Sequence, residues 1–128
     1  MPFLLDTNVL IHLRDGDPTV SAKVADLGGA VLMSIVSRVE LEGGVYRDRA
    51  QVRVRRDRLD VMLEAIPSIA FDDECADAYS AILAAAGYSR RKLLDRMIAA
   101  QAIVHKATLV TMNAPDFAEV AGLDTLVW

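Results

Sequence analysis

Two acidic residues follow apolar runs that predict buried strands. Asp6 comes directly after Phe3-Leu4-Leu5, and a short continuous apolar run is typical of a strand covered on both faces in a parallel sheet. Asp116 lies five residues after the strand candidate 108–111. Ligands of open α/β sheets bind at the carboxyl ends of the strands, so both carboxylates are placed for chemistry. The alternatives are that Asp6 only caps the next helix and that Asp116 is only a turn residue.

Two further acids lie on predicted helices. Asp95 shares a helix face with Ile98 and Ala102, and a carboxylate on this core face is costly unless the start of the helix opens on a polar pocket. Otherwise Asp95 only favours the helix dipole. Glu40 precedes Gly43-Gly44 by one turn, so its helix face is small and leaves room for a ligand. Each glycine costs a helix about 1 kcal/mol, which predicts close packing at both.

The chemistry of four converging carboxylates is restricted. They repel one another unless protons or metal ions neutralise them. Oxygen ligands select hard cations such as Mg²⁺ or Mn²⁺. Such ions, held by carboxylates and waters, activate water and stabilise a leaving oxygen, which suits phosphodiester hydrolysis.

The composition bounds the class of protein. A chain of 128 residues that is 53% hydrophobic and 25% charged predicts one globular domain with its own core. The net charge of -4 argues by itself against a nucleic-acid binder, although basic residues are clustered locally. The single cysteine, Cys75, fits a reducing compartment. No signal peptide or membrane span is recognisable, so we expect a soluble, cytoplasmic protein.

The pattern of apolar residues alternates between strand and helix. Strands are predicted at 3–5, 30–35, 67–71, 108–111 and 126–128, and helices at 9–13, 21–27, 38–45, 47–66, 72–86 and 93–105. Thr7 or Asn8 is expected to cap the first helix and Ser37 the third. This alternation predicts an α/β domain with a mainly parallel sheet.

Four blocks, in this order, resemble the motifs of PIN-domain nucleases and in particular of VapC-type toxins. The blocks are Leu4-Leu5-Asp6-Thr7-Asn8, the segment 34–44 with a serine three residues before Glu40-Leu41, the segment 95–100, and the segment 109–117; Gly122-Leu123 and Trp128 match the usual ending. The resemblance covers essentially the whole chain, as a single PIN domain over residues 1–128. It implies a three-layer fold with a five-stranded, mainly parallel sheet and helices on both faces.

The resemblance also implies roles for individual residues. Asp6, Glu40 and Asp95 would be the acids that bind Mg²⁺, with Mn²⁺ as a substitute. Asp116 is assigned as the fourth acid, because Asn113 stands where many relatives have an acid. Ser37 and Asn113 would be polar residues that support the acids. The implied activity is that of an endoribonuclease that cleaves structured RNA such as tRNA and inhibits translation.

Partners follow from the same resemblance. A VapB-type antitoxin is expected to be extended and amphipathic, to lie in a groove near Glu40 and Arg58, and to place a basic side chain at the acids. A homodimer is expected, and a hetero-oligomer with the antitoxin. Arg47, Arg53 and the segment Arg90-Arg91-Lys92 are candidates for contacting RNA phosphates or the antitoxin, and the alternative is an ordinary solvated helix face.

Two other functions fit parts of the pattern. Asp6 could be the nucleophile of a Mg²⁺ phosphatase of the haloacid-dehalogenase type, but that family has a second aspartate two residues later, where this chain has Asn8. The chain could also be a PIN-type binding module without activity, although such a role would not require the four acids.

Overall fold

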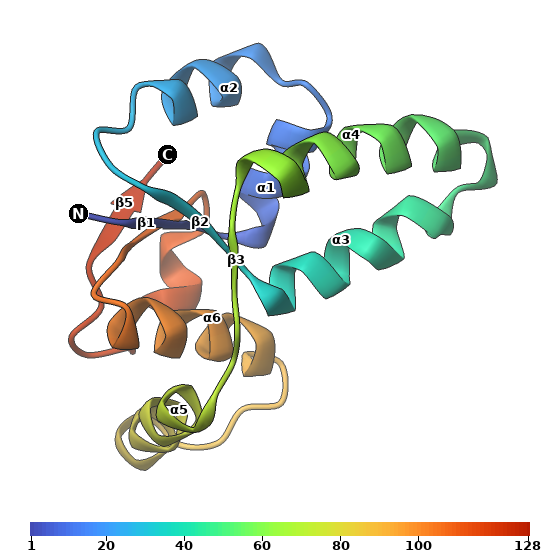
Figure 1. Cartoon of the computed structure of the whole chain (residues 1–128). Helices are drawn as coiled ribbons and strands as arrows, with labels where there is room; N and C mark the ends of the chain where they lie inside the picture. Colours follow the sequence, from blue (N-terminus) through green and yellow to red (C-terminus); the bar gives the residue numbers. More distant parts are fainter.

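The computed structural model describes all residues from 1 to 128 and has a five-stranded sheet at its centre (Figure 1). The strands are β1 (Phe3–Leu5), β2 (Val31–Ser34), β3 (Ser68–Ile69), β4 (Thr108–Thr111) and β5 (Thr125–Val127). Every pair of neighbouring strands is parallel, and the order across the sheet is β3-β2-β1-β4-β5. The predicted parallel sheet is thus confirmed.

Six α-helices cover the two faces of this sheet. They are α1 (Thr7–Arg14), α2 (Pro18–Ala25), α3 (Ile35–Arg47), α4 (Val52–Ala65), α5 (Asp73–Ala86) and α6 (Leu93–Val104), with 3₁₀ turns η1 (Arg49–Gln51) and η2 (Ala114–Phe117). In Figure 1, α5 and α6 lie on one side of the sheet and α1, α2 and α4 on the other. The predicted three-layer fold is therefore confirmed. No helix is long and apolar enough to cross a membrane.

Alternating side chains of the central strands divide the core in two. Leu4 of β1 pairs in register with Leu109 of β4, and both face the core formed with α5 and α6. The next residues, Leu5 and Val110, face the core formed with α1, α2 and α4. All four are fully buried. A one-residue slip of register would move each of these side chains to the opposite face of the sheet. This pattern therefore fixes the register and the residue at which each strand ends.

The structure corrects two predicted helix caps. Asp6 caps α1 by accepting from the amide of Thr7, so neither Thr7 nor Asn8 is the cap. Ser34 caps α3 by accepting from the amide of Val36. Ser37 lies inside α3, because the serine at the strand end is the one with the extended backbone that a cap requires.

The predicted helix over 47–66 is also corrected. Asp48 leaves the helical conformation and its carboxylate accepts from the amide of Ala50, so the chain turns through η1 before α4 begins. Helices α3 and α4 consequently form a hairpin that extends away from the sheet (Figure 1). We call this hairpin, residues 35–65, the arm.

Candidate active site

The candidate site lies where the order in which strands are added to the sheet reverses, between β1 and β4. From β1 the chain moves to β2 and β3 on one side, and β4 and β5 are added on the other. Such a switch point opens a crevice at the carboxyl ends of the two adjacent strands. Asp6 follows β1 directly, and its amide donates to the Val110 carbonyl of β4 at 2.9 Å. Thr111, the last residue of β4, lies beside it.

Asp6 is a buried carboxylate held at both oxygens. Its side chain accepts from the Thr7 amide at 2.8 Å through Oδ1 and from the Thr111 hydroxyl at 2.9 Å through Oδ2. The residue is only 4% exposed. Burial raises the pKa of Asp6, and these two hydrogen bonds partly oppose that shift, while the nearby charge of Asp116 adds to it. The carboxylate is therefore fixed in orientation and costly to ionise.

Glu40 reaches the same region from α3. The Thr7 hydroxyl donates to Glu40 Oε1 at 3.1 Å and lies 2.8 Å from the hydroxyl of Ser37. Because Thr7 has one hydroxyl proton and gives it to Glu40, we assign Ser37 as the donor to Thr7. Desolvation raises the pKa of Glu40, and Asp6 contributes by charge repulsion. Ser37, which the sequence placed in the site, thus supports Thr7 and reaches Glu40 only through it.

Asp95 is partly exposed in the first turn of α6. Both interpretations of the sequence, a favourable interaction with the helix dipole and a place in the site, apply to it. Its position is favourable for the helix dipole. It also faces the other acids: burial raises its pKa to about 6, with further contributions from Asp6, Asp116 and Glu40, and only Arg91 opposes the shift. The charge of Asp95 is thus disfavoured by three neighbouring carboxylates at once.

Asp116 completes the group from η2, on the loop after β4. Asn113 donates its side-chain amide to Asp116 Oδ2, and the Asn113 backbone amide donates to the Thr111 hydroxyl at 3.0 Å. Thr111 in turn donates to Asp6. Asn113 therefore links Asp116 to Asp6 through Thr111, and the charge of Asp116 acts on both Asp6 and Asp95.

A cavity of about 450 Å³ is lined by Asp6, Glu40 and Asp95, but not by Asp116. Arg90 and Arg91 from the connector before α6 line the same cavity. The other basic candidates lie elsewhere. Lys92 binds Glu119 at 3.2 Å, Arg47 lines a neighbouring cavity, and Arg53 is exposed on α4 away from the cavities at the site.

Two threonines of the site were missed by the sequence analysis, which considered Thr7 only as a cap and Thr111 only as a strand residue. Both hydroxyls bind the acids, as described above. A threonine that ends a strand beside the predicted switch point is the pattern that could have indicated Thr111. The contact itself requires knowing that β4 lies next to β1.

None of the four acids forms an ion pair with a basic side chain. No group of three or more His, Cys, Asp or Glu side chains is arranged closely enough to hold a metal ion between them. The acids are therefore not a closed cage. An open set of carboxylate oxygens that makes no ion pair suits a hard divalent cation that keeps several of its waters.

A comparison with protein-family models matches residues 3–123 to the PIN domain. The chain belongs to the PIN-domain family. The match spans β1 to β4 and includes the four acids, whereas β5 lies beyond it. The family resemblance predicted from the four sequence blocks is thus confirmed, and it leaves the phosphatase of the haloacid-dehalogenase type without support.

Two curated relatives match over nearly their full lengths. Ribonuclease VapC1 of Rickettsia felis is 31% identical over 98% of this chain and 96% of its own, and Ribonuclease VapC2 of the same organism is 25% identical over 100% and 98%. Among solved structures, VapBC2 of Rickettsia felis bound to a DNA fragment from its promoter contains a chain with a TM-score of 0.87 at 24% identity, covering 100% of this chain and 99% of that one. This last likeness confirms the fold.

Proposed function

We propose that this PIN domain is a cytoplasmic, Mg²⁺-dependent endoribonuclease, the VapC-type toxin of a toxin–antitoxin pair. The observation that carries the proposal is the gathering of Asp6, Glu40, Asp95 and Asp116 near the sheet's switch point, none of them in an ion pair with a basic side chain. The ribonuclease names of the curated relatives support the reaction class. By the same resemblance the substrate is structured RNA such as tRNA, and its cleavage inhibits translation.

The residues of the site have separate roles in this proposal. Asp6 and Asp95 hold the ion directly, while Glu40 and Asp116 hold it directly or through water. A bound divalent cation would supply an activated water and charge stabilisation at the leaving oxygen. Thr7 and Thr111 keep two of the carboxylates oriented by the hydrogen bonds described above. Carboxylate oxygens held in this way need little rearrangement when negative charge develops at the leaving oxygen.

Arg90 and Arg91 give the RNA a place to bind. They line the cavity that contains Asp6 and Asp95, so an RNA phosphate entering the cavity meets guanidinium groups as well as the acids. Arginine binds phosphate through paired N–H donors. Tyr88, 74% exposed on the same connector, is placed to stack on a base.

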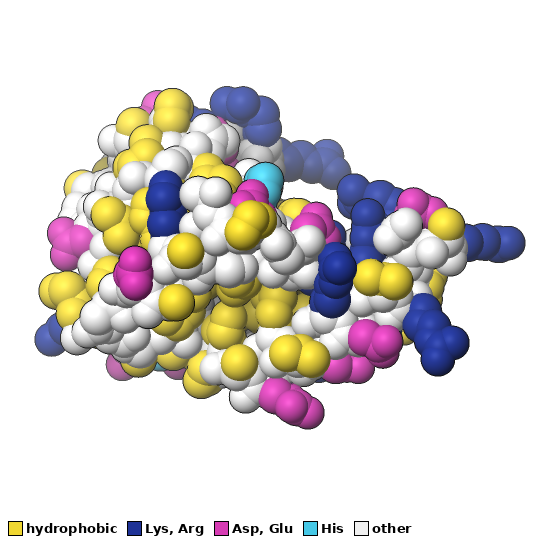
Figure 2. Space-filling view, turned by 90° about the horizontal axis from the view of Figure 1, so that it is seen from above, with side chains coloured by type: hydrophobic (Ala, Val, Ile, Leu, Met, Phe, Trp, Pro, Cys, Tyr) yellow, Lys and Arg dark blue, Asp and Glu magenta, His cyan; other side chains and the backbone are white.

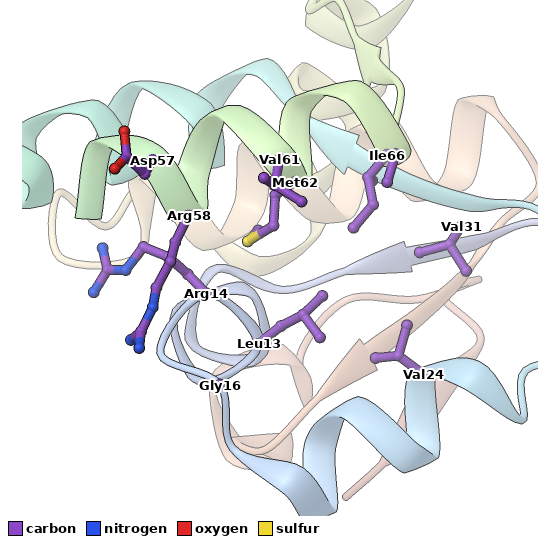
Figure 3. Close-up of a pocket in the computed structure, with 11 residues that line it drawn as sticks. Leu13, Arg14, Gly16, Val24, Val31, Asp57, Arg58, Val61, Met62 and Ile66 are labelled. Atoms are coloured by element: carbon purple, nitrogen blue, oxygen red, sulfur yellow. The ribbon is translucent and has the colours of Figure 1, made fainter. Parts of the chain in front are cut away.

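A separate apolar groove, whose lining includes none of the four acids, is available to the antitoxin. The groove has a volume of about 680 Å³ and is bordered by α1, α2 and α4. In Figure 3, Leu13, Val24, Met62 and Ile66 surround one space, with Arg58 at its rim. Of the two residues expected beside the antitoxin, Arg58 therefore lines this groove, whereas Glu40 does not.

We propose that an apolar stretch of a VapB-type antitoxin fills this groove and that a basic residue of the antitoxin reaches the acids. Solved VapBC complexes among the structural neighbours support an antitoxin partner. An arginine that binds the carboxylates would compete with the metal ion, because each neutralises the same charges.

RNA cleavage is the direct test of the proposed activity. The purified protein, separated from its antitoxin, is incubated with host tRNA in Mg²⁺ or in EDTA. The control is Asp77→Asn, a change at an exposed residue on α5 far from the acids in sequence and without an ion pair. We expect cleavage by the parent and the control in Mg²⁺, and none in EDTA or with Asp6→Asn.

The binding-module alternative predicts a different outcome. A silent PIN domain would bind RNA or the antitoxin equally well with Asp6 or asparagine at this position and would leave RNA intact in Mg²⁺. A phosphomonoester assay run in parallel shows whether any Mg²⁺-dependent activity is directed at another phosphate ester. Cleavage of RNA by Asp6→Asn at the parent rate would refute the assignment of the site.

A further inference from the structure

A second cavity adjoins the acids on the side of the arm. Its volume is about 540 Å³, and it shares Ile11 and Glu40 with the cavity over the acids. Its remaining lining comes from the end of α1, from α3 and from α4, and it is mostly polar: Arg14, Asp15, Val39, Gly43, Gly44, Arg47 and Arg55. The two cavities meet at Glu40, so a chain bound over the acids can continue directly into the second one.

Three arginines make this second cavity basic, and two of them have no carboxylate partner. Arg14 is only 6% exposed and binds Asp15 at 3.0 Å. Arg55 donates to the Gly44 carbonyl at 2.9 Å, which fixes its guanidinium at the cavity wall without neutralising it. Arg47 makes no ion pair. Against the two acids in the lining, the cavity keeps a net positive charge.

Neighbouring arginines of the arm behave differently. Arg56 is fully engaged, with bonds to Glu42 and to Asp60 at 2.6 and 2.7 Å. Arg53 is exposed and lines neither of the two cavities. Figure 2 shows basic side chains gathered toward the end of the arm, in line with the distribution along α3 and α4. Among these arginines of the arm, Arg47 and Arg55 are therefore the ones without an ion pair that line a cavity next to the acids.

Both glycines of α3 line this cavity. The sequence predicted close packing at both of them, and the structure shows it at only one. A Cβ at Gly44 would come within 3.1 Å of the Arg14 guanidinium, so that position is tightly packed. A Cβ at Gly43 would meet nothing within 4 Å, although Gly43 lines the cavity. A helix gains stability from alanine over glycine, so packing does not explain why Gly43 is a glycine.

We infer that the cavity between α1, α3 and α4 binds a backbone phosphate of the RNA next to the one that is cleaved, with Arg47 and Arg55 as its donors and Gly43 leaving room for it. This inference rests on the proposed ribonuclease function. Paired guanidinium donors match a phosphate, and the connection through Glu40 places this phosphate on the same strand. An acidic stretch of the antitoxin is the competing occupant, and the continuity of this cavity with the one that holds the acids favours the RNA strand.

Binding and cleavage of RNA test this inference separately. The probe is a fluorescently labelled synthetic RNA hairpin with single-stranded arms, and its binding is followed by polarisation from 50 to 200 mM salt in EDTA. The variants are Arg47→Gln with Arg55→Gln, Gly43→Ala, and the control Arg53→Gln, which removes one exposed positive charge from α4 outside both cavities. Cleavage of host tRNA by the parent in Mg²⁺ tests the proposed function itself.

The expected results differ between variants. The double arginine variant should bind the RNA at least tenfold more weakly than the parent at 150 mM salt. Its slope of log K against log salt should be smaller by about 0.7, the value for one lost phosphate contact on a single strand. Gly43→Ala should unfold at a higher temperature than the parent and yet bind RNA more weakly, a combination that damage to the fold cannot produce. Arg53→Gln should change binding by less than threefold.

Two results would overturn the inference while leaving the proposed function intact. One is tRNA cleavage by the parent together with equal RNA affinities and salt slopes for the double variant and Arg53→Gln. The other is weakened binding of the antitoxin, but not of RNA, by the double variant, which would assign the cavity to the antitoxin. Failure of the parent to cleave RNA in Mg²⁺, with the salt slopes as expected, would instead refute the proposed function.

Discussion

Replacing Asp95 by asparagine should stabilise the metal-free protein while it removes RNA cleavage. Burial and three neighbouring carboxylates raise the pKa of Asp95 from 3.8 to about 6. At 1.36 kcal/mol for each pKa unit, this shift corresponds to about 3 kcal/mol of unfavourable free energy in the ionised state. Because Asp95 is partly exposed, solvent screening reduces the gain to about 1–2 kcal/mol, which should raise Tm by about 4–8 °C at pH 7.5.

The pH dependence has a definite sign. The folded-state pKa lies above the unfolded value, so Asp95 imposes no cost below about pH 4, where it is protonated in both states. The cost grows as the pH rises and is complete above pH 6. The stabilising effect of Asp95→Asn should therefore be present at pH 7.5 and absent near pH 3.5.

The assay is thermal unfolding of the parent, Asp95→Asn and the control Asp77→Asn in EDTA at these two pH values. Addition of Mg²⁺ should give the parent a higher Tm than Asp95→Asn. A Mg²⁺ concentration of a hundred times Kd stabilises the parent by about 2.7 kcal/mol, whereas the variant has lost a ligand for the ion. Equal Tm values of parent and Asp95→Asn at pH 7.5 in EDTA would refute the reasoning that the acids repel one another in the folded state.

Three other predictions concern the fold and the partners. Arg96→Met should lower the free energy of unfolding in urea by about 2 kcal/mol, because the buried Arg96 guanidinium donates to the Gly87 carbonyl at 2.6 Å and to Glu119 at 3.1 Å; an unchanged urea midpoint would contradict this. Val61 is 67% exposed on the rim of the apolar groove, and Val61→Glu should weaken antitoxin binding at least tenfold in calorimetry without changing Tm. In the same assay, Mn²⁺ should compete with the antitoxin for the parent but not for Asp95→Asn. The protein should be a homodimer by light scattering, and a species of 13.9 kDa at micromolar concentration would exclude this.

The sequence by itself determined the strands and the acids. The apolar runs ending at Leu5 and Thr111 predict buried parallel strands because such strands have both faces covered. A carboxylate placed directly after such a run lies at the edge of the sheet where ligands bind, and this rule alone singled out Asp6. The blocks around Glu40 and Asp95 were recognisable because they combine helix periodicity with an acid that the periodicity does not explain.

Only the tertiary structure decided how these residues meet. The bond from Thr111 to Asp6 joins residues 105 positions apart, and it depends on the pairing of β4 with β1, which local patterns do not encode. Ser34 and Ser37 are both good caps by type, and the end of β2 decided between them. Gly43 and Gly44 are equivalent in sequence, yet one packs against Arg14 and the other faces a cavity, because their positions on α3 differ by about 100° around its axis.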